Sequence, residues 1–223
     1  WSTPNADYFS YDFAYETDRL SGLLMTAPAS QWPIRYRFGY TGGQLTRITQ
    51  TLENGFSDYD SLVTLFTYDG SNRPVASTTT TFLNGESIRE VSLIIDYNDF
   101  RFVVREEGPN AGPFQIFLLD ITGNLERLEE YDVNGGLIRL QDASFDDRPS
   151  PFRGFPAAFK LHFYQQIGPS WHNNATRSRC EDVPAREETF KQVSYSYNDA
   201  GYPTESRTPG ETLVYRMVYG KCE

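Results

Sequence analysis

The sequence has few of the residue types that carry most metal binding and catalysis. Its 223 residues include two cysteines and two histidines. Cys180 and Cys222 have neither a CxxC nor a Cys/His spacing, so they do not indicate a metal site. His162 and His172 have no third metal ligand and no nucleophile at a spacing typical of a metal or catalytic site. Each fits a solvated or core-edge histidine better than a catalytic one. We therefore expect no metal and no cofactor.

Positive charge and long apolar runs are also scarce. Lys and Arg total 20 against 30 Asp and Glu, which gives a formal net charge of −10. Surfaces that follow nucleic-acid phosphates need clustered Lys and Arg, so nucleic acid is not an expected partner, and anionic membrane surfaces are disfavoured for the same reason. The longest apolar stretches, Val91–Ile95 and Phe114–Leu119, are far shorter than the roughly 20 residues of a transmembrane helix. The sequence predicts no transmembrane segment, and its acidity indicates solubility.

Signatures of common enzyme classes are missing as well. No GxSxG motif and no Gly-rich phosphate loop occurs. The acidic DYD segment at 58–60, taken with Asp69, lacks the spacing of a calcium loop. Asp146 and Asp147 are adjacent, and adjacent strand residues point to opposite faces. They can serve as two catalytic carboxylates only if the backbone is irregular there. Turn capping is the simpler interpretation, and the sequence favours a non-catalytic protein over an enzyme.

Alternating aromatic segments dominate what is present. Aromatic residues make up 15% of the chain, mainly 15 Tyr and 16 Phe, which is enough to build a packed core. In Ile34–Tyr40 aromatic residues alternate with arginines, the pattern of a half-buried strand. Asn84-Gly85 is a strong hairpin signal, because a type I′ turn needs positive φ at both central residues. Roughly ten strands, separated by regular turn signals, predict an antiparallel meander in a single all-β domain over residues 1–223.

One hairpin unit recurs along the chain. It combines an aromatic-x-Tyr strand end, a polar pair, a Gly or its substitute, and an aliphatic residue or Pro that begins the return strand. The clearest copy opens Val193–Gly220, whose strands we expect to be antiparallel neighbours that close one edge of the sheet. Such repetition means that each hairpin buries its apolar face on its neighbours. The copies read YRFGYTGGQL, LFTYDGSNRPV, FLLDITGNL, EEYDVNGGLI and YSYNDAGYP.

Two segments depart from this pattern. At residues 11–25 a short helix and a degenerate strand pair both fit. Residues 145–187 are rich in proline, and we expect an irregular insertion there. Within it, Phe155–Gln166 fits either a short amphipathic helix that begins after Pro156 or a strand, and we favour the helix.

The later part of the chain resembles a known family. The segments FDDRPSPF from Phe145, SWHNN from Ser170 and YSYNDAGYP from Tyr195 are similar in order and spacing to motifs of secreted lipoproteins of unknown function from Bacteroidetes-type bacteria, which carry YD-type hairpins. Over the rest of the chain the match is loose. Ser150 stands where the family usually has Asn, and the family's lipid-bearing N-terminal cysteine is not in this sequence.

The resemblance implies a compartment and a shape but no catalytic residues. It implies export to the periplasm or cell surface, a lipid anchor upstream of the sequence, and a meander sheet that curls toward a barrel or half-barrel. The first residue, Trp1, is consistent with a processed product. Cys180 and Cys222 are then either reduced surface thiols or a disulfide that ties the C-terminus to the body, and we favour the disulfide. We expect a monomer that meets the membrane only through the upstream anchor.

Three functions are compatible with these features. Tyr-rich strands without an acid/base or metal constellation favour a non-catalytic binding or structural module of the cell envelope, with a glycan or an envelope protein as its ligand. The alternative is a carrier of a hydrophobic ligand in a groove of a curled sheet. The third is a hydrolase that uses the irregular segment, since function often resides in such loops. The candidate ligand-binding residues are Asp146, Asp147, Trp171, His172, Asn173 and Asn174.

Overall fold

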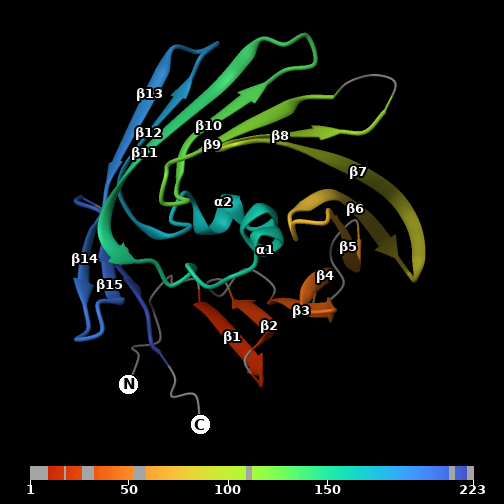
Figure 1. Ribbon diagram of the computed structural model, residues 1–223, viewed down its shortest axis with the longest axis horizontal. Helices are drawn as coiled ribbons and strands as arrows, with labels where there is room; N and C mark the ends of the chain where they lie inside the picture. The colour runs from red at the N-terminus through yellow and green to blue at the C-terminus, as the bar shows by residue number, and fades with distance from the viewer. Residues whose placement is uncertain are drawn as a thin grey trace. The chain divides into compact units, whose positions relative to one another are not determined.

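The chain is built almost entirely of antiparallel strands (Figure 1). The computed structural model describes residues 10–17, 19–26, 33–52, 59–108, 112–210 and 214–219. Thirteen strands form one sheet in which strands adjacent in sequence are hydrogen-bonded neighbours, and three more form a second sheet. The predicted all-β meander of hairpins is confirmed. Within the described ranges, no helix has the length and apolarity that crossing a bilayer requires.

The strands of the first sheet follow one another in chain order, with β1 and β13 at the two ends of that order. They are β1 (Ser10–Glu16), β2 (Arg19–Thr26), β3 (Ile34–Thr41), β4 (Gln44–Leu52), β5 (Ser61–Tyr68), β6 (Pro74–Leu83), β7 (Glu86–Asn98), β8 (Arg101–Glu106), β9 (Phe114–Leu119), β10 (Leu125–Tyr131), β11 (Leu137–Pro149), β12 (Asn173–Asp182) and β13 (Glu187–Gln192). The remaining elements are α1 (Ala157–His162), α2 (Tyr164–Ile167), β14 (Ser194–Tyr197), β15 (Pro203–Arg207) and β16 (Val214–Arg216).

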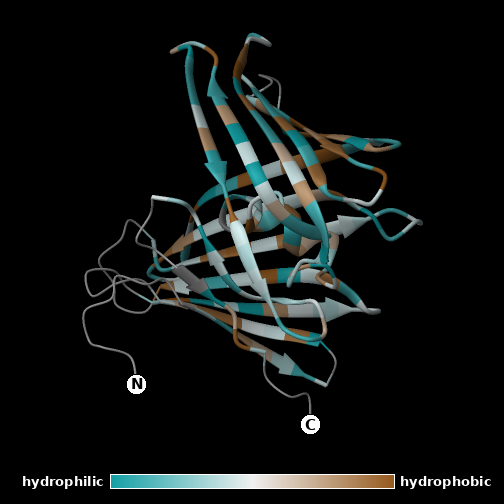
Figure 2. Ribbon diagram, turned by 90° about the vertical axis from the view of Figure 1, so that its left-hand side faces the viewer, coloured by the Kyte–Doolittle hydropathy of each residue, from teal (hydrophilic) through white to brown (hydrophobic). Residues whose placement is uncertain are grey.

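The chain divides into two compact units. The first comprises residues 1–94 with 156–158, and the second comprises residues 95–155 with 159–223. Figure 2 shows hydrophobic and hydrophilic residues interleaved along the strands, as expected for sheets with two different faces. The single domain expected from the sequence stays a prediction.

In the first unit, residue alternation decides which side chains are buried. Tyr36 and Phe38 of β3 are buried, whereas Arg35 and Arg37 between and beside them are exposed. This is the arrangement that the period-2 pattern predicts. Residues 11–25, for which a helix and a strand pair both fitted, belong to the antiparallel pair β1 and β2. The strand interpretation is therefore confirmed.

Some of the hairpins use a two-residue turn. Asn84 and Gly85, between β6 and β7, have φ values of 53° and 80°, as a type I′ turn requires. Gly42 and Gly43, between β3 and β4, have φ values of 58° and 93°. The predicted turn at Asn84-Gly85 is confirmed. The repeat copy YRFGYTGGQL uses this short turn and so differs from the other copies.

The other four copies of the repeat share a five-residue hairpin loop. Its first residue, Asp or Asn, accepts hydrogen bonds on Oδ1 from the N–H groups two and four residues later, at 2.8–3.1 Å. Its fourth residue has a positive φ of 62° to 90°, which Gly and Asn adopt at the least cost. Local side-chain acceptors of this kind stabilise tight turns. The loops are residues 69–73, 120–124, 132–136 and 198–202.

The core of the second unit lies on one face of β8–β10. Phe102, Phe117, Leu128 and Trp171 are buried there together with Ile95 and Leu125, and we call these six residues the central cluster. Side chains of both helices pack against it, among them Leu161 of α1 and Tyr164 and Ile167 of α2. The short helix favoured for Phe155–Gln166 is thereby confirmed.

The irregular insertion is narrower than the predicted range of 145–187. β11 continues to Pro149 and β12 begins at Asn173, so the two strands still pair as far as these residues. Register shifts on either side of Phe145 accommodate the sequence of β11 at this point, since a bulge absorbs residues that do not fit the ladder. Pro149 lies directly after the second register shift, and irregular positions of this kind tolerate proline in a sheet.

The C-terminal strands form a sheet of their own. β14, β15 and β16 are antiparallel neighbours, as expected for Val193–Gly220 where it is described. The expectation that they close one edge of the larger sheet is wrong, because β13 is the last strand of that sheet. β14 instead contacts the larger sheet through side chains. The Tyr195 hydroxyl donates to the Ala175 carbonyl at 2.9 Å, and the Tyr197 hydroxyl donates to Asp146.

Candidate functional site

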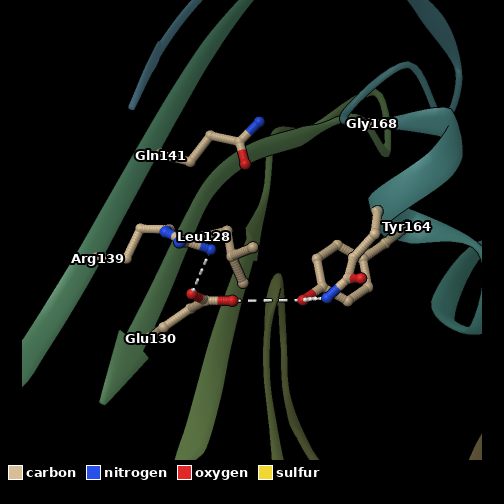
Figure 3. Close-up of a pocket in the computed structure, with 7 residues that line it drawn as sticks. Leu128, Glu130, Arg139, Gln141, Tyr164 and Gly168 are labelled. Atoms are coloured by element: carbon tan, nitrogen blue, oxygen red, sulfur yellow. Dashed lines mark hydrogen bonds and ion pairs between the residues drawn. The ribbon is translucent and has the colours of Figure 1, made fainter. Parts of the chain in front are cut away.

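A pocket of about 340 Å³ lies beside α2 in the second unit (Figure 3). β10 and β11 supply its floor, and α2 with the residue that follows it supplies its wall. Most of the lining side chains are polar. The lining residues are Leu128, Glu130, Arg139, Gln141, Tyr164, Gln165 and Gly168.

The register of β9, β10 and β11 brings the polar floor residues together. Gln115, Glu130 and Arg139 are direct partners across these three strands. Directly paired residues of antiparallel strands present their side chains on the same face. In the next row of this face, Leu128 lies opposite Gln141. The pocket floor therefore follows from the strand register, including a shift between Glu130 and Tyr131 that places Glu130 opposite Arg139.

Glu130 is the centre of the hydrogen-bond network in the pocket. Its side chain is 14% exposed, and Oε2 lies 3.1 Å from Nη1 of Arg139. Oε1 accepts hydrogen bonds from Gln115 Nε2 at 2.8 Å and from the Tyr164 hydroxyl at 3.3 Å. These donors offset the loss of water around a largely buried carboxylate. Figure 3 shows the contacts of Glu130 with Arg139 and Tyr164.

Tyr164 connects the wall of the pocket to its floor. Its hydroxyl accepts hydrogen bonds from Gln115 Nε2 at 2.8 Å and Gln165 Nε2 at 3.0 Å. The ring meets Phe117 edge to face, with centroids 5.5 Å apart. Burial raises the pKa of Tyr164, and the neighbouring Glu130 raises it as well. The hydroxyl therefore keeps its proton at neutral pH and donates it to Glu130.

The helix α2 ends beside the pocket at Gly168. This residue has a φ of 62°, and its N–H donates to the carbonyl of Tyr164 at 2.8 Å. A residue with a Cβ is strained at this φ, whereas glycine is not. Glycine with positive φ is a common way to end a helix. The end of α2, and with it the pocket wall, is set by this residue.

Two floor residues retain hydrogen-bonding capacity for a ligand. The Gln141 amide forms no hydrogen bond with the described part of the chain. Arg139 is 52% exposed and uses its Nη1 on Glu130, which leaves further N–H groups of its guanidinium available. Ligand pockets commonly fix a ligand through a few such convergent polar groups. The floor thus offers both donors and acceptors next to a carboxylate that is already paired.

The structure places Trp171 in the core. It is 4% exposed, and its ring stacks on Phe102 and Phe117 at centroid distances of 6.0 and 6.2 Å. Its Nε1 is buried and has no hydrogen-bond partner among the described residues. Its polar sequence neighbours give no sign of this burial, because the ring packs on aromatic residues of strands far away in sequence. A ring buried in this way has no free face on which a glycan can stack.

His172 and Asn173 hold the hairpin loop 120–124 in place. Asn124, which is itself buried, accepts hydrogen bonds on Oδ1 from the backbone N–H groups of His172 at 3.0 Å and Asn173 at 2.7 Å. Its Nδ2 donates to Oδ1 of Asn173 at 3.1 Å. These contacts fix the start of β12. A ligand-binding role for His172 and Asn173 stays a prediction.

Asp146 and Asp147 are adjacent in sequence, but their side chains have different surroundings. Asn174 Nδ2 lies 3.4 and 3.3 Å from the two carboxylate oxygens of Asp146, and the Tyr197 hydroxyl donates to the same carboxylate. Burial and the hydrogen bond to Asp146 raise the pKa of Tyr197. The Asp147 side chain is 94% exposed and lies 3.6 Å from Arg148. The structure does not bring the two carboxylates together.

Neither histidine belongs to a metal site in the described ranges. Burial lowers the pKa of His162 to about 4. The pKa of His172 is also lowered, by burial first and then by Arg153 and Lys160. Both imidazoles are therefore neutral at pH 7. No group of three or more His, Cys, Asp or Glu side chains in these ranges is arranged to hold a metal ion.

Of the two cysteines, Cys180 lies within the described residues. Cys180 is half-buried in β12 and forms no disulfide with another described residue, and it lies opposite Gln141 across β11 and β12. Cys222 lies outside the described residues, so the expected disulfide stays a prediction. The first residue of the acidic DYD segment, Asp58, also lies outside them.

The floor of the pocket was not predicted from the sequence. The candidate site was expected in the irregular segment, which supplies the wall through Tyr164 and Gly168. The floor residues Glu130 and Arg139 come from the hairpin of β10 and β11 instead. The hairpin loop alone gives no signal for this pair. A regular ladder closed by the loop 132–136 would place Glu130 opposite Ile138, and a register shift between Glu130 and Tyr131 places Arg139 there instead.

Comparison with known proteins shows a likeness of fold. A porin-like protein from Bacteroides vulgatus matches 93% of this chain and 93% of its own, with 10% sequence identity and a TM-score of 0.54. A porin-like protein from Bacteroides uniformis matches 87% of this chain and 92% of its own, with 12% identity and a TM-score of 0.26, too low to support an inference. No protein-family model and no curated protein matches the sequence. At 10% identity the first likeness shows the fold alone.

Proposed function

We propose that the chain is a non-catalytic binding module of the bacterial cell envelope, and that its pocket binds a hydroxyl-rich ligand of the glycan type. The observation that carries this proposal is the pair of available polar groups on the floor, the Gln141 amide and the guanidinium of Arg139. Each combines planarity with several hydrogen-bonding positions. Two such groups side by side match the closely spaced hydroxyls of a sugar.

The network around Glu130 favours binding over hydrolysis. Glycoside hydrolysis typically needs two carboxyl groups on either side of the bond that is cleaved. The pocket lining contains one carboxylate, Glu130, and it is held by Arg139, Gln115 and Tyr164. Its role in this proposal is to fix the Arg139 side chain, which lowers the entropy lost when a ligand binds.

The composition of the lining also separates this proposal from a carrier of hydrophobic ligands. Such a carrier needs a predominantly apolar cavity. Leu128 is the one aliphatic side chain of this pocket, and its other side chains are polar except for the glycine. The pocket therefore suits a polar ligand.

The envelope location rests on two separate observations. The fold resembles that of a porin-like protein from Bacteroides vulgatus, and the motifs of the later chain resemble those of exported lipoproteins. Both are consistent with a protein that works in the periplasm or at the cell surface, held there by a lipid anchor. The specific ligand is then part of the bacterial surface or its surroundings.

A glycan array followed by calorimetry tests the proposal. We expect the wild-type chain to bind a subset of glycans, and Arg139→Ala and Gln141→Ala each to weaken binding of the best one about 10-fold, since each removes hydrogen bonds to the ligand. Arg177→Ala is the matched control, because Arg177 pairs with Ser144 on the opposite face of β11 and β12 and should leave binding unchanged. Circular dichroism verifies that each variant is folded. Absence of any glycan binding, or full affinity in the Arg139→Ala, Gln141→Ala double variant, would remove the pocket as a glycan site.

A further inference from the structure

Two arginines lie on the same exposed face of β3 and β4 in the first unit. Arg37 and Arg47 are both exposed, and they belong to the face opposite the one on which Ile48 is buried. Arg37 lies directly opposite Thr49, and Arg47 lies directly opposite Gly39. Directly paired residues of antiparallel strands present their side chains on one face. The register therefore places both arginines and Thr49 on neighbouring positions of this face.

The side chain of Arg47 lies over β3, the strand that carries Arg37. Gly39 leaves the space for it, because a Cβ at Gly39 would lie 3.2 Å from the Cβ and 3.9 Å from the Cδ of Arg47. The Nε of Arg47 donates to the hydroxyl of Thr49 at 3.2 Å. The Thr49 oxygen accepts this bond and still has its own proton to donate. Two guanidinium groups and one hydroxyl are thus gathered around Thr49.

No carboxylate neutralises these arginines in the part of the chain that the structure describes. Neither Arg37 nor Arg47 forms an ion pair there. On this face β1 contributes Asp12, which is two strands away from β3. The flanking strands β2 and β5 present small, hydroxylated or apolar residues to the two rows of Arg35 and Arg37 and the row of Arg47, namely Gly22, Leu24, Ser61, Val63 and Leu65. The patch is therefore positive in a chain whose net charge is −10.

We infer that Arg37, Arg47 and Thr49 form a binding site for a tetrahedral oxyanion of the phosphate or sulfate type. A guanidinium donates paired N–H bonds to the oxygens of such an anion and stays charged at every pH at which the protein is folded. The Thr49 hydroxyl adds a third donor. Because Thr49 and Gly39 already fix the Arg47 side chain, little of its freedom remains to be lost on binding. The site is independent of the pocket and of the glycan proposal.

Two sources of the anionic group are compatible with the surroundings. One is a dissolved phosphate or sulfate compound, and the other is the phosphate of a lipid headgroup. Leu65 lies directly opposite Arg47 and is 48% exposed, and an apolar side chain next to cations suits a lipid surface. The net charge of the chain opposes this source, because an acidic protein is repelled by an anionic membrane. The dissolved compound is therefore the favoured source.

Titration with inorganic phosphate and with sulfate at low ionic strength, followed by calorimetry, tests the site. We expect Arg37→Met and Arg47→Met each to weaken binding about 10-fold, because each removes charge-assisted hydrogen bonds. Thr49→Val keeps the shape of the side chain and should weaken binding about 3-fold. The lost interactions involve exposed groups, so these variants should fold like the wild type, which circular dichroism verifies.

Arg89→Met is the matched control for the arginine variants. Arg89 is also exposed, but it shares the row of Leu62 and Thr81 on the other face of the sheet. Its substitution should leave anion binding unchanged. Wild-type affinity in the Arg37→Met, Arg47→Met double variant would overturn the proposal. The absence of binding to phosphate, to sulfate and to the vesicles described next would overturn it as well.

Co-sedimentation with vesicles distinguishes the two sources. The vesicles consist of phosphatidylcholine, with and without phosphatidylglycerol. A lipid headgroup predicts binding to the anionic vesicles that is lost in the Arg37→Met, Arg47→Met double variant and weakened in Leu65→Ser. A dissolved compound predicts phosphate or sulfate binding that Leu65→Ser leaves unchanged, with no vesicle binding. Vesicle binding that survives the double variant would contradict a headgroup site at these arginines.

Discussion

Glu130 and Arg139 face each other across β10 and β11, and their contact has an exposed counterpart of equal length in the same unit. Arg139 Nη1 lies 3.1 Å from a Glu130 side chain that is 14% exposed. Arg105 Nε also lies 3.1 Å from its partner, Asp96, but there the side chains are 48% and 58% exposed. Because the two ion pairs have the same length and differ in exposure, a comparison of them isolates the effect of burial on the stability that an ion pair contributes.

We predict unequal stability losses for the two arginines. Arg139→Met should lower the free energy of unfolding by about 1–2 kcal/mol, because it leaves a largely buried carboxylate with one charged partner fewer. Arg105→Met should change it by less than about 0.5 kcal/mol, since exposed ion pairs contribute little. Urea denaturation measures both values. Equal losses would show that the surroundings of Glu130 are not different from those of Asp96.

The fourth position of the repeated hairpin loop should favour Gly, tolerate Asn and disfavour Ala. Gly135 has a φ of 82°, so Gly135→Ala should cost about 1–2 kcal/mol of stability. Gly135→Asn should cost less, because Asn72 occupies the equivalent position with a φ of 62°. Gly70→Ala is the control, since Gly70 has open space around its Cβ position and no positive φ. Thermal unfolding should rank the variants in this order, and a harmless Gly135→Ala would contradict the common loop geometry.

The hydroxyl of Tyr197 should stabilise the attachment of β14 to the larger sheet. Tyr197→Phe removes the hydrogen bond to Asp146 and keeps the ring under the Arg148 guanidinium, 5.8 Å from its centroid. We expect a loss of about 1.5–3 kcal/mol, the usual value for a hydrogen bond to a charged group. Tyr202→Phe, at a more exposed position, should cost less than about 0.5 kcal/mol. Similar values for the two variants in urea denaturation would argue against this role of the Asp146 contact.

Burial of His162 should make the protein less stable in acid. Its pKa is lowered to about 4 in the folded chain, against roughly 6.5 in the unfolded chain. Between these values the unfolded state binds a proton at His162 and the folded state does not, so the free energy of unfolding falls as the pH drops from about 6.5 to about 4. Above this range the contribution is fully present.

Substitution of the histidine isolates this effect. His162→Phe should reduce the difference in unfolding free energy between pH 4.5 and pH 7, whereas His172→Gln should leave the part due to His162 in place. Denaturant titrations at the two pH values measure the difference. An unchanged pH dependence in His162→Phe would mean that other groups account for the acid sensitivity.

The hairpins were predictable because their signals are local. The Asn84-Gly85 turn and the loops that begin at Asp69 and Asp132 each depend on residues within five positions of one another. Alternation in β3 likewise determined which side chains are buried. Turn residues and strand alternation can be recognised within a short window of sequence, and the structure confirms both.

Features that depend on distant partners were not predictable in the same way. The burial of Trp171 is one of them, because its ring packs on Phe102 and Phe117, which lie far away in sequence. The N–H of Val193 still bonds to the Thr176 carbonyl beside β12, and the strand that follows, β14, pairs with β15 in a separate sheet. The pocket depends on the meeting of α2 with β10, which no short window of sequence encodes.

The shared hairpin loop also leaves one position of each copy open to change. Its first, fourth and fifth residues make the backbone bonds that define it, and the N–H of its third residue bonds to the Asx side chain. The second residue takes no part in this pattern and is exposed in every copy, as Gly70, Ile121, Val133 and Asp199. These four tips are therefore suitable places for a fluorophore or a short epitope, with the surrounding strands left as they are.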